Sequence, residues 1–475
     1  MSGKPSGQRD LTQGPIAKTL LIFALPTLGA NVLQSLNGSV NSIWVGNFLG
    51  EQALAATSNA NLVMFLMFAG IFGLAMATTI MVGQNMGRSD VEAARRALGS
   101  AIALIAGLSV VTALLGWIFT PALLDVLATP ADAKPLAISY LRIIFLLMPF
   151  AFLTTLVSSA LRGMGDAMTP FWIMVLNVVL DALFNPLLIL GIGPFPAMGI
   201  AGSATATLIA ALVTVVVTII IIYKRDLPIR LRGPEWAYLK PDPVLLKSII
   251  AKGVPMSLSM TVLSASMLVM IGLVNRQGVT TTAAFGVTSQ LWSYIQMPAL
   301  AIGAAVSAMA AQNIGANKWD RVERIAWSGA GINVLLTGTM VVALTLVDRP
   351  LLGLFLTPDS PAVPIAMHIH NIVAWSFILF GVSMVLSSTM RANGAVMVPL
   401  FILFIACFPV RVGFAEFARD WLGTDALWWA FSATSIASLI LTLAYYLWGP
   451  WRKARMLVAD PAPDAAPDAT GAGLT

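Results

Sequence analysis

The chain has 475 residues, of which 58% are hydrophobic and 10% are charged, and its mean hydropathy is +0.86. A water-soluble domain carries about 25% charged residues, so this composition excludes a soluble globular protein, and the formal net charge of +6 does not by itself indicate nucleic-acid binding. Apolar runs long enough to cross a hydrocarbon core of about 30 Å as helices recur along the chain. Because these runs lack the alternation of barrel strands, the sequence predicts an all-α polytopic membrane protein.

Twelve candidate transmembrane helices follow one another along the chain, separated by clusters of charged residues, glycine and proline. They cover residues 16–47, 53–82, 94–120, 134–158, 168–192, 200–223, 245–275, 281–309, 323–347, 363–388, 396–416 and 425–448.

Basic residues are distributed unequally between the two ends of these spans. The side of the N-terminus is assigned 21 of the 27 lysines and arginines, and the opposite side is assigned Lys134, Arg142, Arg276, Arg349, Arg411 and Arg419. No basic residue is assigned to the middle of a span. By the positive-inside rule, we expect both termini in the cytoplasm and the protein in the cytoplasmic (inner) membrane.

The two halves of the chain resemble each other. The stretch "VGQNMGRSDVEAARRA" recurs as "AAQNIGANKWDRVERIA", and "LRGMGDAMTP" recurs as "MRANGAVMVP", at offsets of 228 or 229 residues. Each half holds six spans, so both halves enter the membrane from the same side and form a parallel pseudo-two-fold repeat. The predicted units are an N-terminal lobe (1–223), a basic linker (224–243), a C-terminal lobe (244–455) and a disordered tail (456–475).

One acidic residue, Asp181, lies near the middle of a predicted span, in the stretch "FWIMVLNVVLDALFNPLLILG". A charged carboxyl at a helix centre costs on the order of 3 kcal/mol on insertion scales, and burial favours its neutral form. We therefore expect Asp181 to bind protons or a cation. Asn177 and Asn185 lie one turn to either side of it. The alternative is a protonated aspartate that only joins two helices.

Other polar or adaptable residues in the spans are candidates for a transport pathway. The first span carries a polar face with Asn41, and Pro26 upstream is a candidate hinge. The candidate substrate contacts are polar or aromatic or, like methionine, able to repack around different ligands. They are Gln34, Met64, Phe68, Gln290 and Tyr294. Helix packing or contact with lipid is the alternative for each.

The sequence lacks the residues that several functions require. The sequence has no G-x-x-x-x-G-K-[ST] phosphate loop and no sizeable soluble domain, which excludes ATP-driven transport within this chain. His368 and His370 diverge on a helix, so no metal site is expected, and the single cysteine, Cys407, allows no internal disulfide. A flippase for lipid-linked headgroups would need basic residues in mid-span, and a membrane enzyme would need clustered catalytic groups. We expect neither an enzyme nor a cofactor.

Taken together, the motifs resemble those of the multidrug and toxic compound extrusion (MATE) transporters over roughly residues 14–450. The resemblance rests on "ALPTLGANVLQSLNGSVNSIWVGNFLGEQALAA", both Gln-Asn-x-Gly motifs, "LRGMGDAMTP", "NVVLDALFNPLLILG" and "MGIAGSATAT". It implies two six-helix bundles in a V shape. It also implies cation-driven export of organic compounds, often cationic and amphipathic.

The resemblance further implies roles for individual residues. Asp181 and Asn177 match the acid and amide of a cation site in the N-terminal lobe, Thr207 matches a nearby hydroxyl, and Pro26 matches a proline at which the first helix bends. Asn41 stands where many members carry aspartate, which removes one anionic ligand from a sodium site. We therefore expect a proton-coupled antiporter, with a sodium-coupled exporter of the same family or a flippase for lipid-linked headgroups as the alternatives. The expected protein is a monomer in contact with membrane lipid that binds small organic cations and no nucleic acid.

Overall fold

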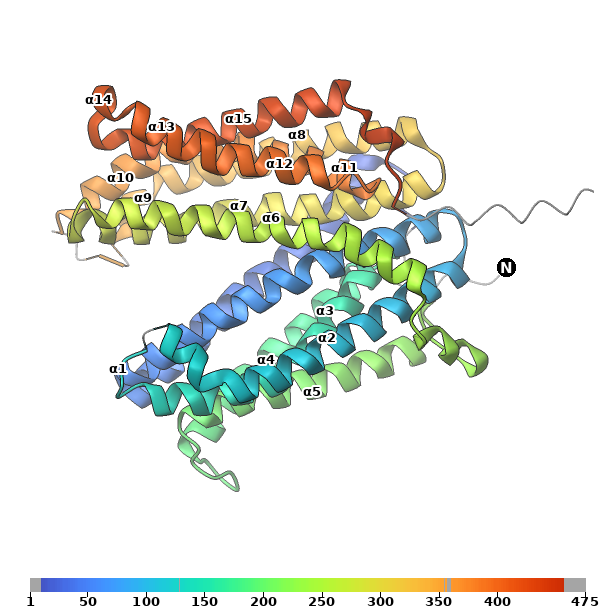
Figure 1. Cartoon of the computed structure of the whole chain (residues 1–475), viewed down its shortest axis with the longest axis horizontal. Coiled ribbons are helices and arrows are strands. Elements are labelled where there is room, and N and C mark those ends of the chain that lie inside the picture. Colours follow the sequence, from blue (N-terminus) through green and yellow to red (C-terminus); the bar gives the residue numbers. More distant parts are fainter. Residues whose placement is uncertain (1–9, 128, 354, 357–359, 457–475) are drawn as a thin grey trace, which may run out of the picture.

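The computed structural model describes residues 10–127, 129–353, 355–356 and 360–456, and within these ranges the secondary structure is helical throughout (Figure 1). Apart from Met456, the predicted tail (456–475) lies outside the described residues. The N-terminal half contains the helices α1 (Ile16–Gly87), α2 (Val91–Val126), α3 (Lys134–Gly163), α4 (Met168–Leu190) and α5 (Ile200–Lys224). A short 3-10 helix, η1 (Gly233–Leu239), lies in the predicted linker.

The C-terminal half begins with three long helices, α6 (Pro243–Asn275), α7 (Val279–Gly315) and α8 (Trp319–Leu346). The elements that follow are shorter, except for the last helix: α9 (Asp348–Leu352), α10 (Ala362–Val373), α11 (Ser376–Ala392), α12 (Met397–Ile405), η2 (Ala406–Val410), α13 (Arg411–Phe417), α14 (Arg419–Leu422), η3 (Gly423–Asp425), α15 (Ala426–Trp448) and η4 (Pro450–Lys453).

The helices account for all twelve predicted spans. Eleven described segments are long and apolar enough to cross a membrane, and α10 with α11 makes a twelfth that is bent by 44°. The prediction of an all-α polytopic membrane protein is therefore confirmed. The bend lies at Ala374 and Trp375, where neither proline nor glycine marks it in the sequence.

The first two spans are joined without a loop inside α1. Gly50 is the residue with non-helical dihedral angles there, with φ at +81° and ψ at −173°. Such positive φ values are open to glycine because it has no Cβ. One glycine therefore redirects the chain between two membrane-crossing segments.

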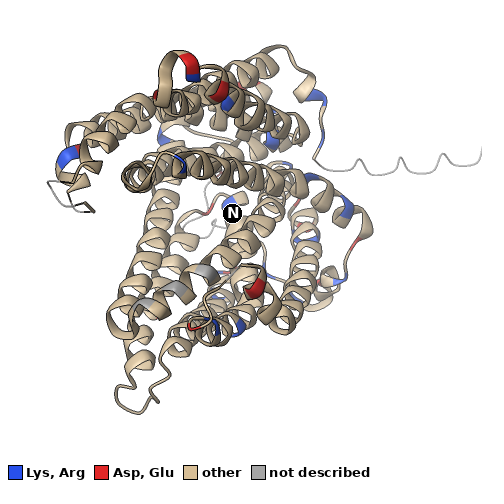
Figure 2. Cartoon of the chain, turned by 60° about the vertical axis from the view of Figure 1, so that its left-hand side comes forward, with Lys and Arg blue, Asp and Glu red and all other residues tan. Residues whose placement is uncertain are grey.

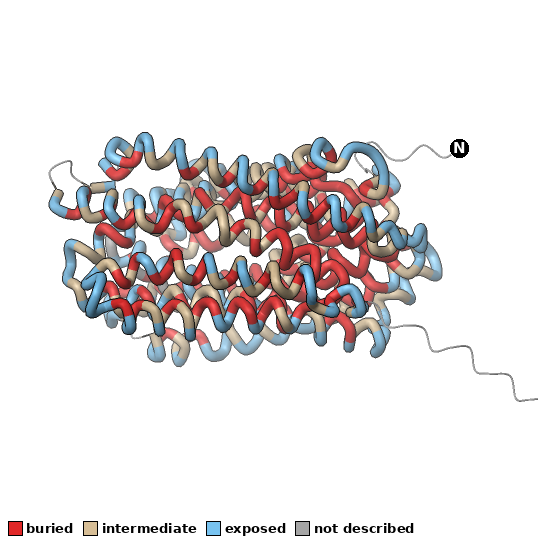
Figure 3. The backbone as a smooth tube through the Cα atoms, turned by 90° about the horizontal axis from the view of Figure 1, so that it is seen from above, coloured by how far each residue is buried: buried red, intermediate tan, exposed pale blue. Residues whose placement is uncertain are grey.

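The helices form two bundles that meet at one end. Figure 1 shows α1–α5 below and α6–α15 above, converging on the side where the N-terminal segment lies and diverging toward the other side. We call the converging side the basic end; it carries the turns at residues 88–90, 164–167 and 316–318 and helix η1. Buried residues are denser toward this end (Figure 3). The helices themselves carry few charged residues (Figure 2).

The buried hydrophobic clusters follow the same V shape. The largest cluster runs through the first bundle and continues at the basic end into α7, α8 and α11, for example at Ala310 and Met390. A second cluster, with Phe285, Trp292 and Trp428, belongs to the second bundle alone. A third cluster joins α1 to α7, α8 and α11, for example at Leu20 and Ile302. The bundles therefore share two buried clusters, and the second bundle also has one of its own.

The repeated glutamines join the two bundles reciprocally. Gln84 Nε2 of α1 donates to the carbonyl of Ala392 at 2.6 Å. Gln312 Nε2 of α7 donates to the carbonyl of Gly163 at 2.8 Å. Each glutamine thus reaches the end of a helix in the opposite bundle.

Two glycines permit this close crossing of α1 and α7. A Cβ on Gly87 would lie 1.9 Å from the Gln312 carbonyl oxygen, and a Cβ on Gly315 would lie 1.9 Å from the Gln84 carbonyl oxygen. Any larger residue would push the two helices apart.

The segment before α1 also crosses to the second bundle. The fully buried Leu11 donates its N–H to Gln312 Oε1 at 3.2 Å, and Asn313 Nδ2 donates to the Leu11 carbonyl at 3.0 Å. Arg321 Nη2 donates to the carbonyls of Gln13 and Gly14 at 2.9 and 2.8 Å. Two sets of hydrogen bonds therefore join the bundles at the basic end: those of the two glutamines and those of the segment before α1.

The substitution Gly315→Ala tests the importance of the helix crossing. Because the added methyl would overlap a backbone carbonyl, we expect a loss of about 1–3 kcal/mol in stability, as for other overpacked contacts. Thermal unfolding of the purified protein in detergent measures this loss. Gly286→Ala in the same helix is the matched control, because a Cβ there meets nothing within 4 Å. Equal unfolding temperatures for the two variants would contradict the role of the crossing.

Candidate functional site

The carboxyl of Asp181 lies in a polar cluster inside the first bundle, with 2% of the residue exposed. Thr207 Oγ1 of α5 donates to Asp181 Oδ1 at 2.8 Å, and Asn185 Nδ2 donates to the same oxygen at 3.2 Å. Asn37 of α1 lies near the same carboxyl. Two helices therefore supply neutral donors to a single acid, and a third places an amide beside it.

The close approach of α4 and α5 brings Thr207 to the acid. A Cβ on Gly202 would lie 2.4 Å from the carbonyl oxygen of Leu188, so only glycine fits where the two helices touch. Thr207 lies five residues further along α5, and Asp181 lies seven residues before Leu188. The glycine at 202 thus sets the distance between hydroxyl and carboxyl.

Asn41 belongs to the same polar region but has different partners. Ser203 Oγ donates to Asn41 Oδ1 at 2.7 Å, and Asn41 Nδ2 donates to the hydroxyl of Tyr140 at 3.4 Å. Tyr140 of α3 is 1% exposed. The sequence analysis did not predict Tyr140 and Ser203 as members of this polar region. Ser203 could have been predicted, because it lies four residues before Thr207 on the same helix face.

The two asparagines that flank Asp181 have different hydrogen-bond partners. Asn185 contacts the carboxyl and also donates to the Asp181 backbone carbonyl at 3.0 Å. Asn177 instead accepts a hydrogen bond from Thr214 Oγ1 at 3.4 Å. The structure therefore places Asn185 directly at the acid and Asn177 one helical turn away.

Two buried oxygens of the cluster lack hydrogen-bond partners within the described residues: Asn37 Oδ1 and Asn185 Oδ1. Amide and carboxylate oxygens suit hard cations and protonated donors. A site for a transition metal finds no support, since the described residues contain no group of three or more His, Cys, Asp or Glu side chains that could hold one. The arrangement can hold a proton or a small hard cation.

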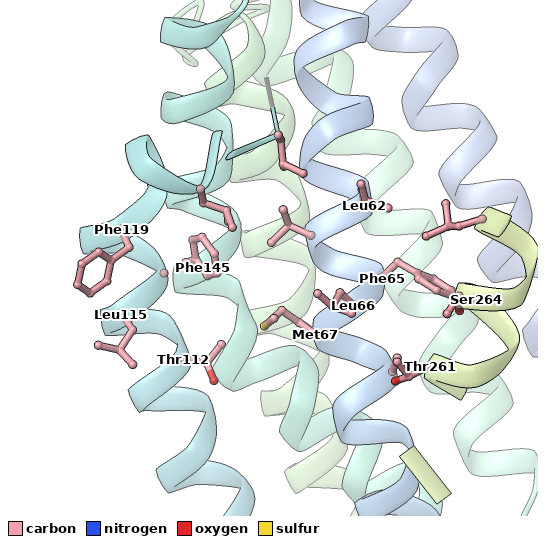
Figure 4. A pocket seen from close by; sticks show the side chains of 17 residues that line it. Leu62, Phe65, Leu66, Met67, Thr112, Leu115, Phe119, Phe145, Thr261 and Ser264 are labelled. Carbon is pink, nitrogen blue, oxygen red and sulfur yellow. The ribbon is translucent and has the colours of Figure 1, made fainter. Parts of the chain in front are cut away.

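A cavity of about 620 Å³ lies between the bundles and is separate from this cluster (Figure 4). It is lined by the second span of α1, by α2 and α3 of the first bundle, and by α6 of the second. Phe65, Leu66 and Phe119 are among its apolar side chains, and Thr261 and Ser264 are among its few polar ones. None of the 17 lining residues carries a charge.

The five predicted substrate contacts lie outside the lining of this cavity. Phe68 packs edge-on against Phe152, with ring centroids 5.5 Å apart, and Met64 is partly buried against the core of the first bundle. Gln290 Nε2 donates to the hydroxyl of Tyr294 at 3.4 Å on α7, and Gln34 is exposed. Their role in binding substrate stays a prediction.

The candidate hinge, Pro26, lies inside an unbroken stretch of α1. Non-helical dihedral angles occur in α1 at Gly50 and not at Pro26. The first span is therefore not broken at its proline in this conformation.

Arg411, which the sequence assigns to the side opposite the N-terminus, is buried inside the second bundle. Arg411 lies inside the span Met397–Phe417 and is 8% exposed. Its Nε donates to Thr434 Oγ1 at 3.0 Å and its Nη1 to Ser266 Oγ at 2.9 Å, while its guanidinium lies over the Phe431 ring at 4.6 Å. These neutral partners offset the loss of water. Arg411 does not line the cavity between the bundles.

Comparison with known proteins identifies the family. The model of the MatE family matches residues 26–187 and 255–415, which together make up more than half of the chain. The chain belongs to the MATE family of membrane transporters. The same family model matches both halves at nearly the offset of the internal repeat, so the repeat is a property of the family. Membership also means that the protein is a transporter and not an enzyme.

Curated relatives and solved structures agree with this assignment. The chain is 35% identical over 454 residues to the "Probable multidrug resistance protein YoeA" of Bacillus subtilis (strain 168), covering 95% of this chain and 98% of that protein. It is 30% identical over 449 residues to the "Probable multidrug resistance protein YpnP" of the same organism, covering 94% and 98%. Its fold is similar to the outward-facing conformation of a multidrug resistance MATE family transporter, with a TM-score of 0.85, 22% identity and coverage of 95% and 98%.

The substitution Thr207→Val tests the contact with the acid. It removes one donor from Asp181, and a hydrogen bond to a charged group contributes about 1.5–3 kcal/mol. We expect a roughly tenfold lower initial transport rate in proteoliposomes. Thr205→Val is the matched control, since its hydroxyl donates to the Ala201 carbonyl of its own helix at 2.7 Å. Equal losses in both variants would show that the Thr207 hydroxyl has no special role.

Proposed function

We propose that the protein is a secondary antiporter that exports organic cations in exchange for protons taken up at Asp181. The observation that carries this proposal is a carboxyl buried within a span and bonded only to neutral groups. The other buried acids of the described chain, Asp166 and Asp348, lie in turns or in a short helix outside the spans. Intramembrane acids of this kind mark ion pathways in transporters.

The cavity between the bundles supports an amphipathic cation as cargo. Its lining is apolar and aromatic and contains no lysine or arginine, so nothing in it repels a positive charge. Aromatic faces also attract cations. The names of the relatives describe multidrug resistance proteins, which is consistent with export of varied compounds. A flippase for anionic headgroups would require basic lining residues, which this cavity lacks.

The proposed direction of transport follows from the charges. By the positive-inside rule, the basic end faces the cytoplasm and the protein lies in the inner membrane. The V would then open away from the cytoplasm, as is required for release of substrate and uptake of external protons. We propose that the lobes, residues 1–223 and 244–455, rock about the basic end during transport, as in other parallel-repeat carriers.

Sodium coupling is a second candidate, favoured by the unpartnered oxygens of Asn37 and Asn185 beside the acid. Against it stands Asn41, which supplies no negative charge. With one acid in the cluster, exchange of one proton for one monovalent cation moves no net charge. The pH gradient then supplies about 1.36 kcal/mol per pH unit, which corresponds to a roughly tenfold concentration ratio of the transported cation.

The first experiment imposes either a pH gradient or a sodium gradient on proteoliposomes loaded with a fluorescent organic cation. We expect the pH gradient alone to drive transport by the wild type, and Asp181→Asn to reduce that transport to the level of empty liposomes. Asp125→Asn is the control, because that exposed acid pairs with Lys134 near the end of a helix. Its transport should remain at the wild-type rate.

Two results would overturn the proposal. Proton-driven transport by Asp181→Asn would make the aspartate a helix contact only. Transport driven by sodium and not by pH would instead select the second candidate.

A second substitution tests the cavity as the binding site. Leu66→Trp adds bulk to the lining in Figure 4, and because overpacked sites exclude ligands we expect the KM for a bulky cation to rise about tenfold, with kcat little changed. Leu114→Trp on α2 is the control, since Leu114 is 60% exposed and does not line the cavity. An unchanged KM in Leu66→Trp would place the binding site elsewhere.

A further inference from the structure

The second bundle contains a buried guanidinium that no carboxylate neutralises. Arg391, near the end of α11, is 9% exposed. Its Nη2 donates to Ser259 Oγ of α6 at the long distance of 3.4 Å, and its Nε has no hydrogen-bond partner within the described residues. None of the described ion pairs includes it. A positive charge so placed needs a counter-ion or water.

Arg391 lines a cavity of about 40 Å³ between α6, α11, α12 and α15. The polar lining consists of the guanidinium and of hydroxyl groups from three helices: Ser259, Ser383, Ser387, Ser438 and Thr442. The remaining lining residues are apolar and carry no negative charge. The polar groups of this cavity are therefore donors or can act as donors.

The hydroxyls form a connected group that can turn toward a ligand. Ser383 Oγ lies 2.8 Å from Ser438 Oγ and 2.9 Å from Thr442 Oγ1. No described hydrogen bond occupies the Ser387 hydroxyl. Because hydroxyl hydrogens rotate to suit their partners, these groups can donate to an anion beside the guanidinium.

We propose that this cavity is a binding site for a small monovalent anion of the size of chloride. A volume of 40 Å³ holds one or two water-sized occupants and is far below the roughly 300 Å³ of the smallest typical organic-ligand pockets. Charge and size thus select a small inorganic anion. The anion neutralises Arg391 inside the second bundle, and its binding does not depend on the transport mechanism proposed above.

The other arginines within the spans make poorer sites. Arg162, which corresponds to Arg391 in the repeat, is more exposed and donates to Ser159 Oγ at 3.0 Å. The guanidinium of Arg411 is already engaged by Ser266, Thr434 and the Phe431 ring. Arg142, Arg230 and Arg321 also hold a buried nitrogen without a partner among the described residues, but at Arg391 such a nitrogen occurs beside a cavity lined by hydroxyl groups.

The test measures binding of radioactive chloride to the purified protein in detergent, with gluconate holding the ionic strength constant. We expect one saturable site per chain and an unfolding temperature that rises with chloride and not with gluconate. Arg391→Gln should weaken chloride binding about tenfold or more, because it removes a charge-assisted donor. Arg162→Gln is the matched control, since it removes the same charge at the repeat-related position, and it should bind chloride as the wild type does.

A second variant covers the case in which Arg391→Gln does not fold. Combining Ser383→Ala with Ser387→Ala leaves the charge in place and should weaken binding several-fold. Absence of a saturable site in the wild type would overturn the proposal and assign the cavity to water. Undiminished binding in Arg391→Gln, or in the double serine variant, would likewise overturn it.

Discussion

The reciprocal contact of Gln84 and Gln312 is the constraint on which the shape of the molecule depends. Each amide satisfies the carbonyl of a residue at the end of a helix in the opposite bundle, where carbonyls have no partner within their own helix. The contact requires backbones to approach so closely that Gly87 and Gly315 admit no side chain. Because both links lie at the basic end, the bundles are held together there and are free to diverge at the other end.

The divergence leaves the two candidate sites in different places. The apolar cavity lies where α1 and α6 begin to separate, whereas the acid lies inside the first bundle, among donors from α4 and α5. Asn41, Tyr140 and Ser203 extend the hydrogen-bonded cluster from α5 to α3, and α3 also supplies Phe145 to the cavity wall.

The two halves of the repeat share a backbone plan but differ in buried charge. The first bundle contains an acid within a span, at Asp181, while the second contains the guanidiniums of Arg391 and Arg411. Only the structure shows that both guanidiniums are buried, because a position in the sequence does not say which helices cover a side chain. Inside the bundle their side chains are covered by neighbouring helices. Arginines thus recur at the repeat-related positions 162 and 391, whereas Asp181 and Arg411 each occur in one bundle alone.

The sequence by itself determined the membrane class, the twelve spans, the repeat and the position of Asp181 within a span. Lipid requires about twenty apolar residues per crossing helix and makes a buried acid conspicuous, and both are local properties of the chain. The tertiary structure decided the bend between α10 and α11, the choice of Asn185 over Asn177 as a direct partner, and the residues that line the cavities. These features depend on which faces of distant helices meet. Helices that are apolar on all sides do not specify those faces in the sequence. The glycines and amides at the helix crossings specify them in the folded protein.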